Sequence, residues 1–272
     1  MDPIQQTFAG SGESALALDI FKPAAPSKET AVLLLHGGGW RMGDRSFMHG
    51  YARYLAGRGF TSIAVQYRLL DQAPWPAQLE DVVAAAKWAR SHAKELGVRS
   101  DRIVLEGFSA GAHLALMAGA KGSDVAAVVA FFPPTRLAVT PSSSGESDTK
   151  MLLGPDAKPE AAEAASPIAQ VHSAYPPTLL LHGSADWMIA PDASRAMYDR
   201  LIAVGAKAEL HIFFGEHHEF SIASGMIAPV QDLVADFLRR TVIDPQGHTE
   251  EMLRENPFAG GPQAFAARMG GG

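Results

Sequence analysis

Ser109, Asp186 and His218 each follow an apolar run of strand length, and together they could activate a hydroxyl group. A serine hydroxyl is too weakly acidic to attack a carbonyl group unless a base removes its proton. His218 is the expected base, which later donates the proton to the leaving group. Asp186 is expected to orient the imidazole and to stabilise its charged form. Because parallel strands end at one edge of a sheet, we expect the three residues to meet there.

Ser109 lies within Gly107-Phe108-Ser109-Ala110-Gly111, between a predicted strand and a predicted helix. This G-x-S-x-G pattern is typical of a nucleophile elbow, whose tight turn needs glycine two positions before and after the serine. The N-terminus of the helix would direct free N–H groups and a positive dipole at a developing oxyanion. We therefore expect the backbone N–H of Ala110 to contribute to an oxyanion hole. For this segment alone, an ordinary strand–helix turn is the alternative.

A second glycine-rich segment, residues 36–40 (His-Gly-Gly-Gly-Trp), follows the apolar run 31–35. Successive glycines after a buried strand indicate backbone that approaches another group closely or adopts conformations unfavourable for other residues. A dinucleotide-binding loop would need glycine where Met42 stands, so an oxyanion loop of the H-G-G-G type fits better. Gly38 and Gly39 are the expected donors from this loop. A plain glycine-rich turn remains the alternative.

Other titratable residues lie near these motifs. His217 is the rival of His218 as the base, and the spacing to Phe220 favours His218. We expect His36 to shape its loop, and the remaining histidines to be structural because no third residue completes a triad with them. Glu106 lies three residues before the nucleophile, at the end of a predicted buried strand. We interpret it as a hydrogen-bonded structural acid, with a role in tuning the site as the alternative.

Aromatic and charged residues flank the predicted catalytic loops. Trp40, Phe108 and Trp187 are the expected lining of a substrate pocket, with plain core packing as the alternative for buried aromatic residues. Arg68 and Asp81 are expected to form a structural ion pair beneath the site, with two solvated charges as the alternative.

Composition excludes several classes of protein. The chain has 272 residues, 47% of them hydrophobic, which is enough to bury a large core. A formal charge of −6 and the lack of a Lys/Arg run argue against a nucleic-acid partner. There is no cysteine, and the zinc-protease motif H-E-x-x-H that begins at His218 fails at Ile222, so we expect no metal and no cofactor. No signal peptide is visible and the longest apolar run, 125–132, is too short to span a membrane. A cytoplasmic location is therefore expected.

Apolar runs alternate with helical patterns, which predicts an α/β domain with a parallel sheet over residues 1–243. The predicted strands are 31–35, 60–67, 102–106, 125–132, 178–181 and 208–214, after edge strands within 7–22; the predicted helices are 47–58, 79–96, 112–118, 193–204 and 230–240. Residues 135–165 are polar and lack a strand pattern, so we expect a small lid or loop insertion over the site. The tail, 244–272, contains a predicted short helix near 263–269 and is expected to be flexible or to contact a second copy in a homodimer.

These motifs resemble those of the α/β-hydrolase fold, and within it the hormone-sensitive-lipase-like carboxylesterases and the acetyl/feruloyl esterases. The resemblance covers about residues 15–240. It is carried by H-G-G-G-W at 36–40, the Tyr-Arg-Leu to Asp segment at 67–81, G-F-S-A-G at 107–111, H-G-x-x-D at 182–186 and H-x-F at 218–220. It implies a mostly parallel central sheet with helices on both faces and a small lid insertion. Phe108 departs from the aspartate of many hormone-sensitive-lipase-like members, and the sheet is expected to begin too early for their N-terminal helical cap.

The resemblance implies a serine carboxylesterase that hydrolyses small, short-acyl esters through an acyl-enzyme intermediate. An arylformamidase or amidase on the same triad is the alternative, because kynurenine formamidases also carry an H-G-G-x-W loop. A non-catalytic ligand-binding homologue is the third possibility. Such proteins usually lose a member of the triad, whereas this chain keeps a serine, an aspartate and a histidine in the expected order.

Overall fold

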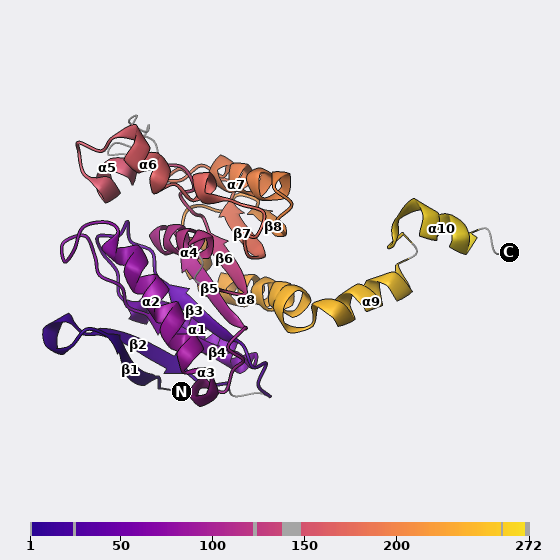
Figure 1. Ribbon diagram of the computed structural model, residues 1–272, viewed down its shortest axis with the longest axis horizontal. Helices are drawn as coiled ribbons and strands as arrows, with labels where there is room; N and C mark the ends of the chain where they lie inside the picture. Colours follow the sequence, from indigo (N-terminus) through magenta and orange to yellow (C-terminus); the bar gives the residue numbers. More distant parts are fainter. Residues whose placement is uncertain (1, 24–25, 122–123, 138–147, 257, 270–272) are drawn as a thin grey trace.

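The computed structural model describes the whole chain except residues 1, 24–25, 122–123, 138–147, 257 and 270–272, and an eight-stranded sheet organises the described part (Figure 1). The strands are β1 (Ile4–Ala9), β2 (Leu16–Phe21), β3 (Ala31–Leu35), β4 (Thr61–Val65), β5 (Ile103–Phe108), β6 (Ala127–Phe131), β7 (Thr178–Gly183) and β8 (Ala208–Phe213). Their spatial order is β1-β2-β4-β3-β5-β6-β7-β8. The pairs β1–β2 and β2–β4 are antiparallel and all the others are parallel, which confirms the predicted mostly parallel sheet.

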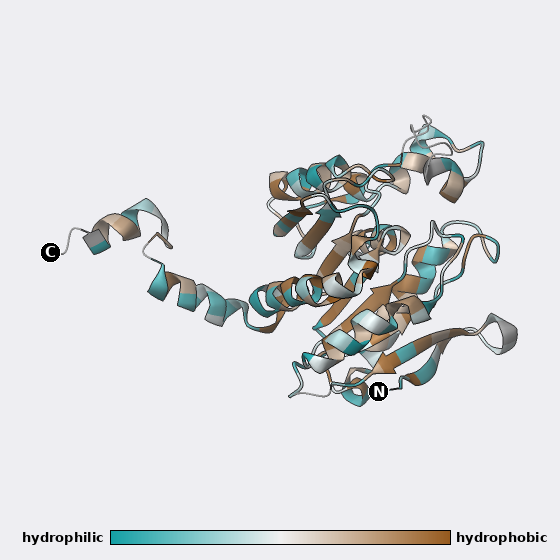
Figure 2. Cartoon of the chain, turned by 180° about the vertical axis from the view of Figure 1, so that it is seen from behind, coloured by the Kyte–Doolittle hydropathy of each residue, from teal (hydrophilic) through white to brown (hydrophobic). Residues whose placement is uncertain are grey.

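Helices cover both faces of this sheet. They are α1 (His49–Gly57), α2 (Ala77–Ser91), α3 (Ala93–Leu96), α4 (Ala110–Ala120), α5 (Asp148–Leu153), α6 (Pro159–Ala164), α7 (Asp192–Ala203), α8 (Ser224–Leu238), α9 (Pro245–Glu255) and α10 (Gly261–Met269). One hydrophobic cluster packs α2, α4 and α7 on the sheet, and a second packs α1 and α8 on the opposite face. The inner strands are mostly hydrophobic (Figure 2), and β3 and β6 are hydrophobic along their whole length because neither face meets water.

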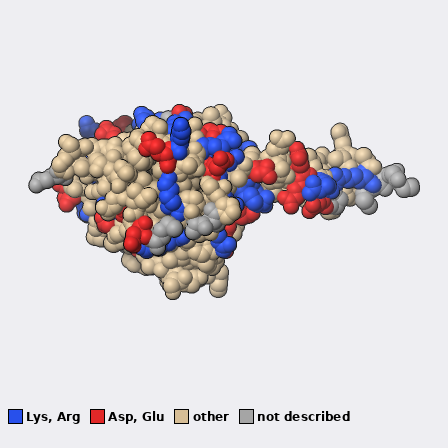
Figure 3. Space-filling view, turned by 90° about the horizontal axis from the view of Figure 1, so that it is seen from below, with Lys and Arg blue, Asp and Glu red and all other residues tan. Residues whose placement is uncertain are grey.

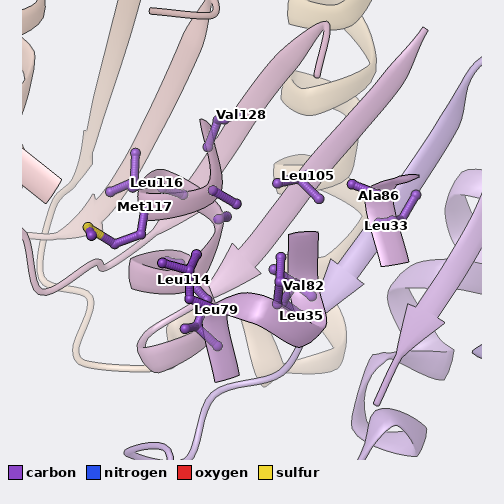
Figure 4. Close-up of a cluster of buried hydrophobic side chains, with 14 of the residues drawn as sticks. Leu33, Leu35, Leu79, Val82, Ala86, Leu105, Leu114, Leu116, Met117 and Val128 are labelled. Carbon is purple, nitrogen blue, oxygen red and sulfur yellow. The ribbon is translucent and has the colours of Figure 1, made fainter. Parts of the chain in front are cut away.

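The first cluster shows how the nucleophile strand is held. Leu33 and Leu35 of β3 and Leu105 of β5 belong to one cluster with α2, whose Val82 lies beside Leu35 (Figure 4). All four side chains are fully buried. Burial of one such side chain contributes about 1.5–3 kcal/mol to folding, so these contacts fix β5, and the turn that follows it, relative to its neighbours.

Two helix predictions need correction. The predicted helix 79–96 is divided into α2 and α3, because His92 between them leaves the helical conformation. The helix predicted from residue 230 begins earlier, at Ser224, and continues through Pro229. Proline removes one backbone hydrogen bond inside a helix. The apolar face that α8 packs against α1 and the sheet outweighs this cost.

The segment predicted as a lid contains α5 and α6, while residues 138–147 lie outside the described part. Helix α5 packs on the glycine-rich loop, because a Cβ added at Gly39 would lie 2.8 Å from Sδ of Met151. The two ends of the insertion are joined by Ser166, whose Oγ accepts a hydrogen bond from the N–H of Leu137.

The C-terminal tail forms α9 and α10 and extends away from the rest of the molecule (Figures 1 and 3). Helix α10 lies where the sequence predicts a short helix. Helix α9 has no sequence prediction, and its first turn is capped by Asp244, which accepts from the N–H of Gly247. In the described part of the chain, no helix combines the length and the hydropathy needed to cross a membrane.

Candidate active site

Ser109 occupies a strained turn between β5 and α4, with φ of 52° and ψ of −115°. A positive φ is unfavourable for a residue with a side chain and persists only where its surroundings impose it. The turn is tight because two glycines let the backbone pack closely, and neither position has room for a side chain. A Cβ at Gly107 would lie 2.2 Å from the Gly111 carbonyl oxygen, and a Cβ at Gly111 would lie 2.3 Å from the Leu35 carbonyl oxygen. The turn therefore has the geometry expected of a nucleophile elbow.

The loops after β5, β7 and β8 bring Ser109, Asp186 and His218 together at one edge of the sheet. The hydroxyl of Ser109 donates to Nε2 of His218 at 3.0 Å, and Nδ1–H of His218 donates to Oδ2 of Asp186 at 2.7 Å. The side chain of Asp186 is fully buried and that of His218 is 7% exposed. The arrangement can transfer the proton of Ser109 to an imidazole whose resulting charge faces a carboxylate.

Asp186 is held by more than its contact with His218. Its Oδ1 accepts the N–H groups of Met188 and Ile189, each at 2.9 Å. Burial opposes ionisation of the carboxyl group, but hydrogen bonds from His182, His218 and Ile189 outweigh burial and hold the pKa of Asp186 well below its usual range. The carboxylate is thus ionised whenever the imidazole needs a counter-charge.

His182, expected from the sequence to be a structural histidine, contacts the aspartate of the site. It is fully buried, and its Nε2–H donates to Oδ2 of Asp186 at 3.1 Å and to the Ile189 carbonyl at 2.9 Å. The hydroxyl of Ser194 contacts Nδ1 at 2.7 Å, which holds the ring with Nε2 facing Asp186. Two histidines therefore share one oxygen of the aspartate. The H-G-x-x-D spacing indicates this contact, because it puts His182 and Asp186 at the same strand end.

His218, and not its neighbour His217, contacts the serine. His217 is exposed, and its Nδ1–H donates to the carbonyl of Ala185.

Arg68 and Asp81 form the predicted ion pair: Nε and Nη2 of the guanidinium donate to the carboxylate at 2.8 and 2.6 Å. The N–H of Arg68 donates to the same carboxylate, so the pair fixes the backbone after β4.

The glycine-rich loop passes beside the serine. A Cβ added at Gly37 would lie 3.4 Å from Cβ of Ser109, so the loop reaches the serine at Gly37, the residue before Gly38. Gly38 has φ of 113°, and a Cβ there would lie 2.1 Å from the Met42 carbonyl oxygen. Ala110 begins α4, so its N–H has no partner within the helix. Gly38 and Gly39 follow Gly37 directly in the chain, and the oxyanion role expected of them and of Ala110 stays a prediction.

Tyr67 anchors the start of this loop. Its ring stacks on the imidazole of His36 at 4.4 Å, and its hydroxyl donates to the His36 carbonyl at 2.8 Å. Burial lowers the pKa of His36, which favours the neutral ring in this contact. His36 therefore has the loop-shaping contacts expected of it.

A cavity of about 450 Å³ lies at the glycine-rich loop and next to the triad, because its lining includes Phe108, which precedes Ser109, and Phe132, whose ring lies 4.7 Å from that of His218. Phe108, Phe132 and Tyr51 contribute aromatic side chains to its lining, together with Glu219. Of the other side chains proposed for the pocket, Trp40 is 1% exposed and packs edge-on against His113, whereas Trp187 is 70% exposed. Phe108 is thus the aromatic residue among the three that lines this cavity.

Glu106 is completely buried beneath the elbow. Its Oε1 accepts from the side-chain amide of Gln231 on α8, while Oε2 has no hydrogen-bond partner among the described residues. Burial raises the pKa of Glu106 to about 8, and the hydrogen bond from Gln231 opposes the shift. The neutral acid is therefore the favoured form at pH 7. These contacts agree with the structural role favoured for this residue.

No group of three or more His, Asp or Glu side chains is arranged to hold a metal ion in the part of the chain that the structure describes. The site is therefore built from a serine, a histidine pair, an aspartate and backbone N–H groups. The fold is that of an α/β hydrolase, and the site has the serine, histidine and aspartate expected of that class.

The chain belongs to the BD-FAE family, whose family model matches residues 18–201. Among curated relatives, esterase LipC of Mycobacterium tuberculosis is 29% identical over 84% of this chain and 63% of its own length. Esterase LipQ of the same organism is 31% identical over 84% of this chain and 60% of its own length. The chain thus spans about three-fifths of the length of these relatives.

Solved structures agree with the family assignment. The apo form of Thermogutta terrifontis esterase 2 superposes with a TM-score of 0.76 and 26% identity, covering 89% of this chain and 96% of that chain. The propionate-bound form superposes with the same TM-score and 25% identity, covering 89% of this chain and 95% of that chain. The expected α/β-hydrolase fold and the resemblance to esterases are therefore confirmed.

Proposed function

We propose that this protein is a serine carboxylesterase that hydrolyses small, short-acyl esters through an acyl-enzyme intermediate. The observation that carries the proposal is the continuous hydrogen-bonded series from Ser109 through His218 to Asp186, which the glycine-rich loop approaches at Gly37. The esterase relatives and esterase structures support a carboxylic-ester hydrolase.

In this mechanism Oγ of Ser109 attacks the ester carbonyl carbon while its proton passes to Nε2 of His218. The charge that develops on the imidazole faces the carboxylate of Asp186. The carbonyl oxygen becomes an oxyanion, for which we propose the N–H groups of Gly38, Gly39 and Ala110 as donors. When the intermediate collapses, the alcohol departs with the proton of His218 and leaves an acyl group on Ser109. Water then repeats the sequence and releases the acid.

The preference for a short acyl group has separate support. The cavity beside Ser109 has a volume of about 450 Å³, which is at the small end of ligand sites. Solved structures of the related Thermogutta terrifontis esterase 2 include propionate-bound and butyrate-bound forms. We propose that α5, which packs on the glycine-rich loop, acts as part of a lid over the site.

The test is the turnover of p-nitrophenyl esters of increasing acyl length by the wild-type protein and by Ser109→Ala. We expect the wild type to cleave short esters and the variant to lose several orders of magnitude in kcat, because the nucleophile is absent. A serine-directed phosphonate should form an adduct at Ser109 only in the wild type. A folded wild-type protein that leaves every short activated ester intact would overturn the proposal.

The formamidase alternative can be separated by one comparison. Turnover of N-formylkynurenine and of p-nitrophenyl acetate should be measured with the same enzyme sample. We expect the ester to be the better substrate, because the curated relatives and the solved structures named above are esterases. A clear preference for the formamide would overturn the esterase proposal in favour of a formamidase.

We also propose that α9 and α10 contact a second copy of the chain. No residue of α9 is buried, and Met252, Leu253 and Phe258 expose 38%, 42% and 70% of their surface. Sedimentation of the full chain should be compared with a chain that ends at Asp244, which keeps the Ile243 carbonyl bonded to Arg102. We expect the mass of the assembly to fall to that of a monomer. Equal association of both chains would contradict the proposal.

A cytoplasmic location stays a prediction.

A further inference from the structure

The cavity beside Ser109 is lined mainly by apolar side chains. Phe108, Phe132 and Tyr51 are nearly fully buried and contribute aromatic surface to its lining. Met42 and Phe47 also line it and are exposed by 67% and 66%. Exposed apolar side chains around a recess are typical of a site that binds apolar groups of a ligand. Whatever part of the substrate enters this cavity must therefore have mainly apolar surface.

Glu219 is the charged side chain in the lining of this cavity. Both Glu219 and Ser109 lie next to Gly37. A Cβ added at Gly37 would be 3.2 Å from Oε1 of Glu219 and 3.4 Å from Cβ of Ser109. The carboxylate is thus close to both the nucleophile and the glycine-rich loop.

The carboxylate of Glu219 lacks an internal partner among the described residues, because no ion pair or side-chain hydrogen bond involves it there. The nearby hydroxyl of Tyr51 donates to Oγ of Ser221 instead, at 3.0 Å. The backbone of Glu219 has φ of 57°, a conformation that is rare for residues with a side chain. A strained residue directly after His218 thus carries an unpaired charge beside the site.

We propose that this cavity binds an organic ammonium group of the ester substrate, with Glu219 as the residue that determines specificity. This inference rests on the proposed esterase activity and names the substrate class. An alkylated ammonium group combines a positive charge with apolar surface and is weakly hydrated. Aromatic faces attract such a cation, and a carboxylate at the edge of the cavity adds an ion pair. An anionic group of the same size would be repelled.

The acyl part or the alcohol part of the ester could carry the cation, and two pairs of substrates separate these cases. The acyl pair is p-nitrophenyl 4-(trimethylammonio)butanoate and its neutral isostere p-nitrophenyl 5,5-dimethylhexanoate. The alcohol pair is 2-(trimethylammonio)ethyl acetate and its neutral isostere 3,3-dimethylbutyl acetate. The measured quantity is the ratio of kcat/KM for the cationic ester to kcat/KM for its neutral isostere. A substitution that slows the chemical step equally for both esters leaves this ratio unchanged.

We expect this ratio to favour the cation in one pair, and Glu219→Gln to lower it about tenfold or more. Glu219→Lys should reverse the preference. Glu250→Gln removes one negative charge from the exposed helix α9 and is the matched control, which should leave the ratio unchanged. An unchanged ratio in Glu219→Gln, or an equal change in the control, would overturn the inference. So would an equal loss of activity on cationic and neutral esters, because Glu219 would then act on the catalytic residues.

Binding can be measured without turnover. Calorimetric titration of Ser109→Ala with butyltrimethylammonium should show binding that Glu219→Gln weakens about tenfold. If neutral esters are cleaved but this cation does not bind, the inference fails while the proposed esterase activity stands. If the cation binds but no ester is cleaved, the esterase proposal fails while recognition of the cation stands.

Discussion

Nε2–H of His182 donates to Oδ2 of Asp186 at 3.1 Å, and this is the same oxygen that accepts the hydrogen bond from His218. Both groups of this pair are completely buried, so water does not compete for the bond. The hydroxyl of Ser194 orients the His182 ring from its other side. Asp186 is therefore positioned by a second histidine that does not contact the serine.

We expect His182→Gln to lower kcat by about 10–100-fold, because a hydrogen bond to a charged group contributes about 1.5–3 kcal/mol. KM should change little, since His182 contacts Asp186 rather than the substrate. Steady-state kinetics with p-nitrophenyl acetate provide the measurement. His172→Gln, which changes an exposed histidine, is the matched control and should behave as the wild type. A folded His182→Gln protein with unchanged kcat would show that the pair has no role in positioning Asp186.

Asp186→Asn should lower kcat by about 10³–10⁴-fold. An asparagine amide can donate a hydrogen bond to Nδ1 of His218, which would stabilise the tautomer with its proton on Nε2, facing Ser109. That tautomer cannot accept the serine proton. Asp192→Asn changes an exposed acid on α7 that pairs with Arg195, and serves as the control. The proposed role of Asp186 would be wrong if both variants retained similar activity.

Gly38→Ala should lower kcat by about 100-fold or more, with a smaller effect on substrate binding. The new Cβ would lie 2.1 Å from the Met42 carbonyl oxygen, and φ of 113° is unfavourable for alanine, so the loop must move. Loss of one oxyanion donor typically costs about 3 kcal/mol of transition-state stabilisation.

The matched control for this change is Gly57→Ala in α1, where an added Cβ meets no atom within 4 Å. Alanine is favoured over glycine inside a helix, so this variant should keep full activity and gain a few tenths of a kcal/mol or more in stability. Circular dichroism and thermal unfolding separate a displaced loop from a misfolded chain. Normal activity of Gly38→Ala would remove Gly38 from the proposed oxyanion hole.

Glu106 should make the free energy of unfolding depend on pH. Burial raises the pKa of its carboxyl group from 4.5 to about 8, so above pH 4.5 the folded state binds the proton more tightly than the unfolded state. The contribution of this group to stability is fully present below pH 4.5, is lost progressively as the pH rises toward 8, and changes no further above that value.

Glu106→Gln removes this dependence and keeps an amide of similar shape near Gln231. We expect the variant to gain stability relative to the wild type as the pH rises from 5 to 9, by up to a few kcal/mol. Urea unfolding at pH 5, 7 and 9 gives the comparison. Identical pH profiles for both proteins would mean that Glu106 does not titrate with a raised pKa in the folded state.

Much of the fold could be predicted because the relevant signals are local. The apolar run 31–35 matches the bounds of β3, since a strand covered on both faces needs continuous hydrophobic sequence.

The C-terminal tail shows where prediction from local composition fails. Its Gly, Pro and Ala content suggested little structure, yet the capping contact of Asp244 with Gly247 starts a helix at Pro245. That contact depends on one side chain rather than on average composition.

The sequence by itself determined the elbow at Ser109, the glycine-rich loop and the order of the three residues of the site, because each depends on residue type next to a strand end. Only the tertiary structure decided which further side chains share the site. Glu219 reaches Gly37 because the loop after β8 is placed beside the loop after β3. Likewise, Trp40 lies in the core and Trp187 at the surface, although both follow strand ends. The physical reason is that convergence depends on packing between elements far apart in the chain, which local patterns do not encode.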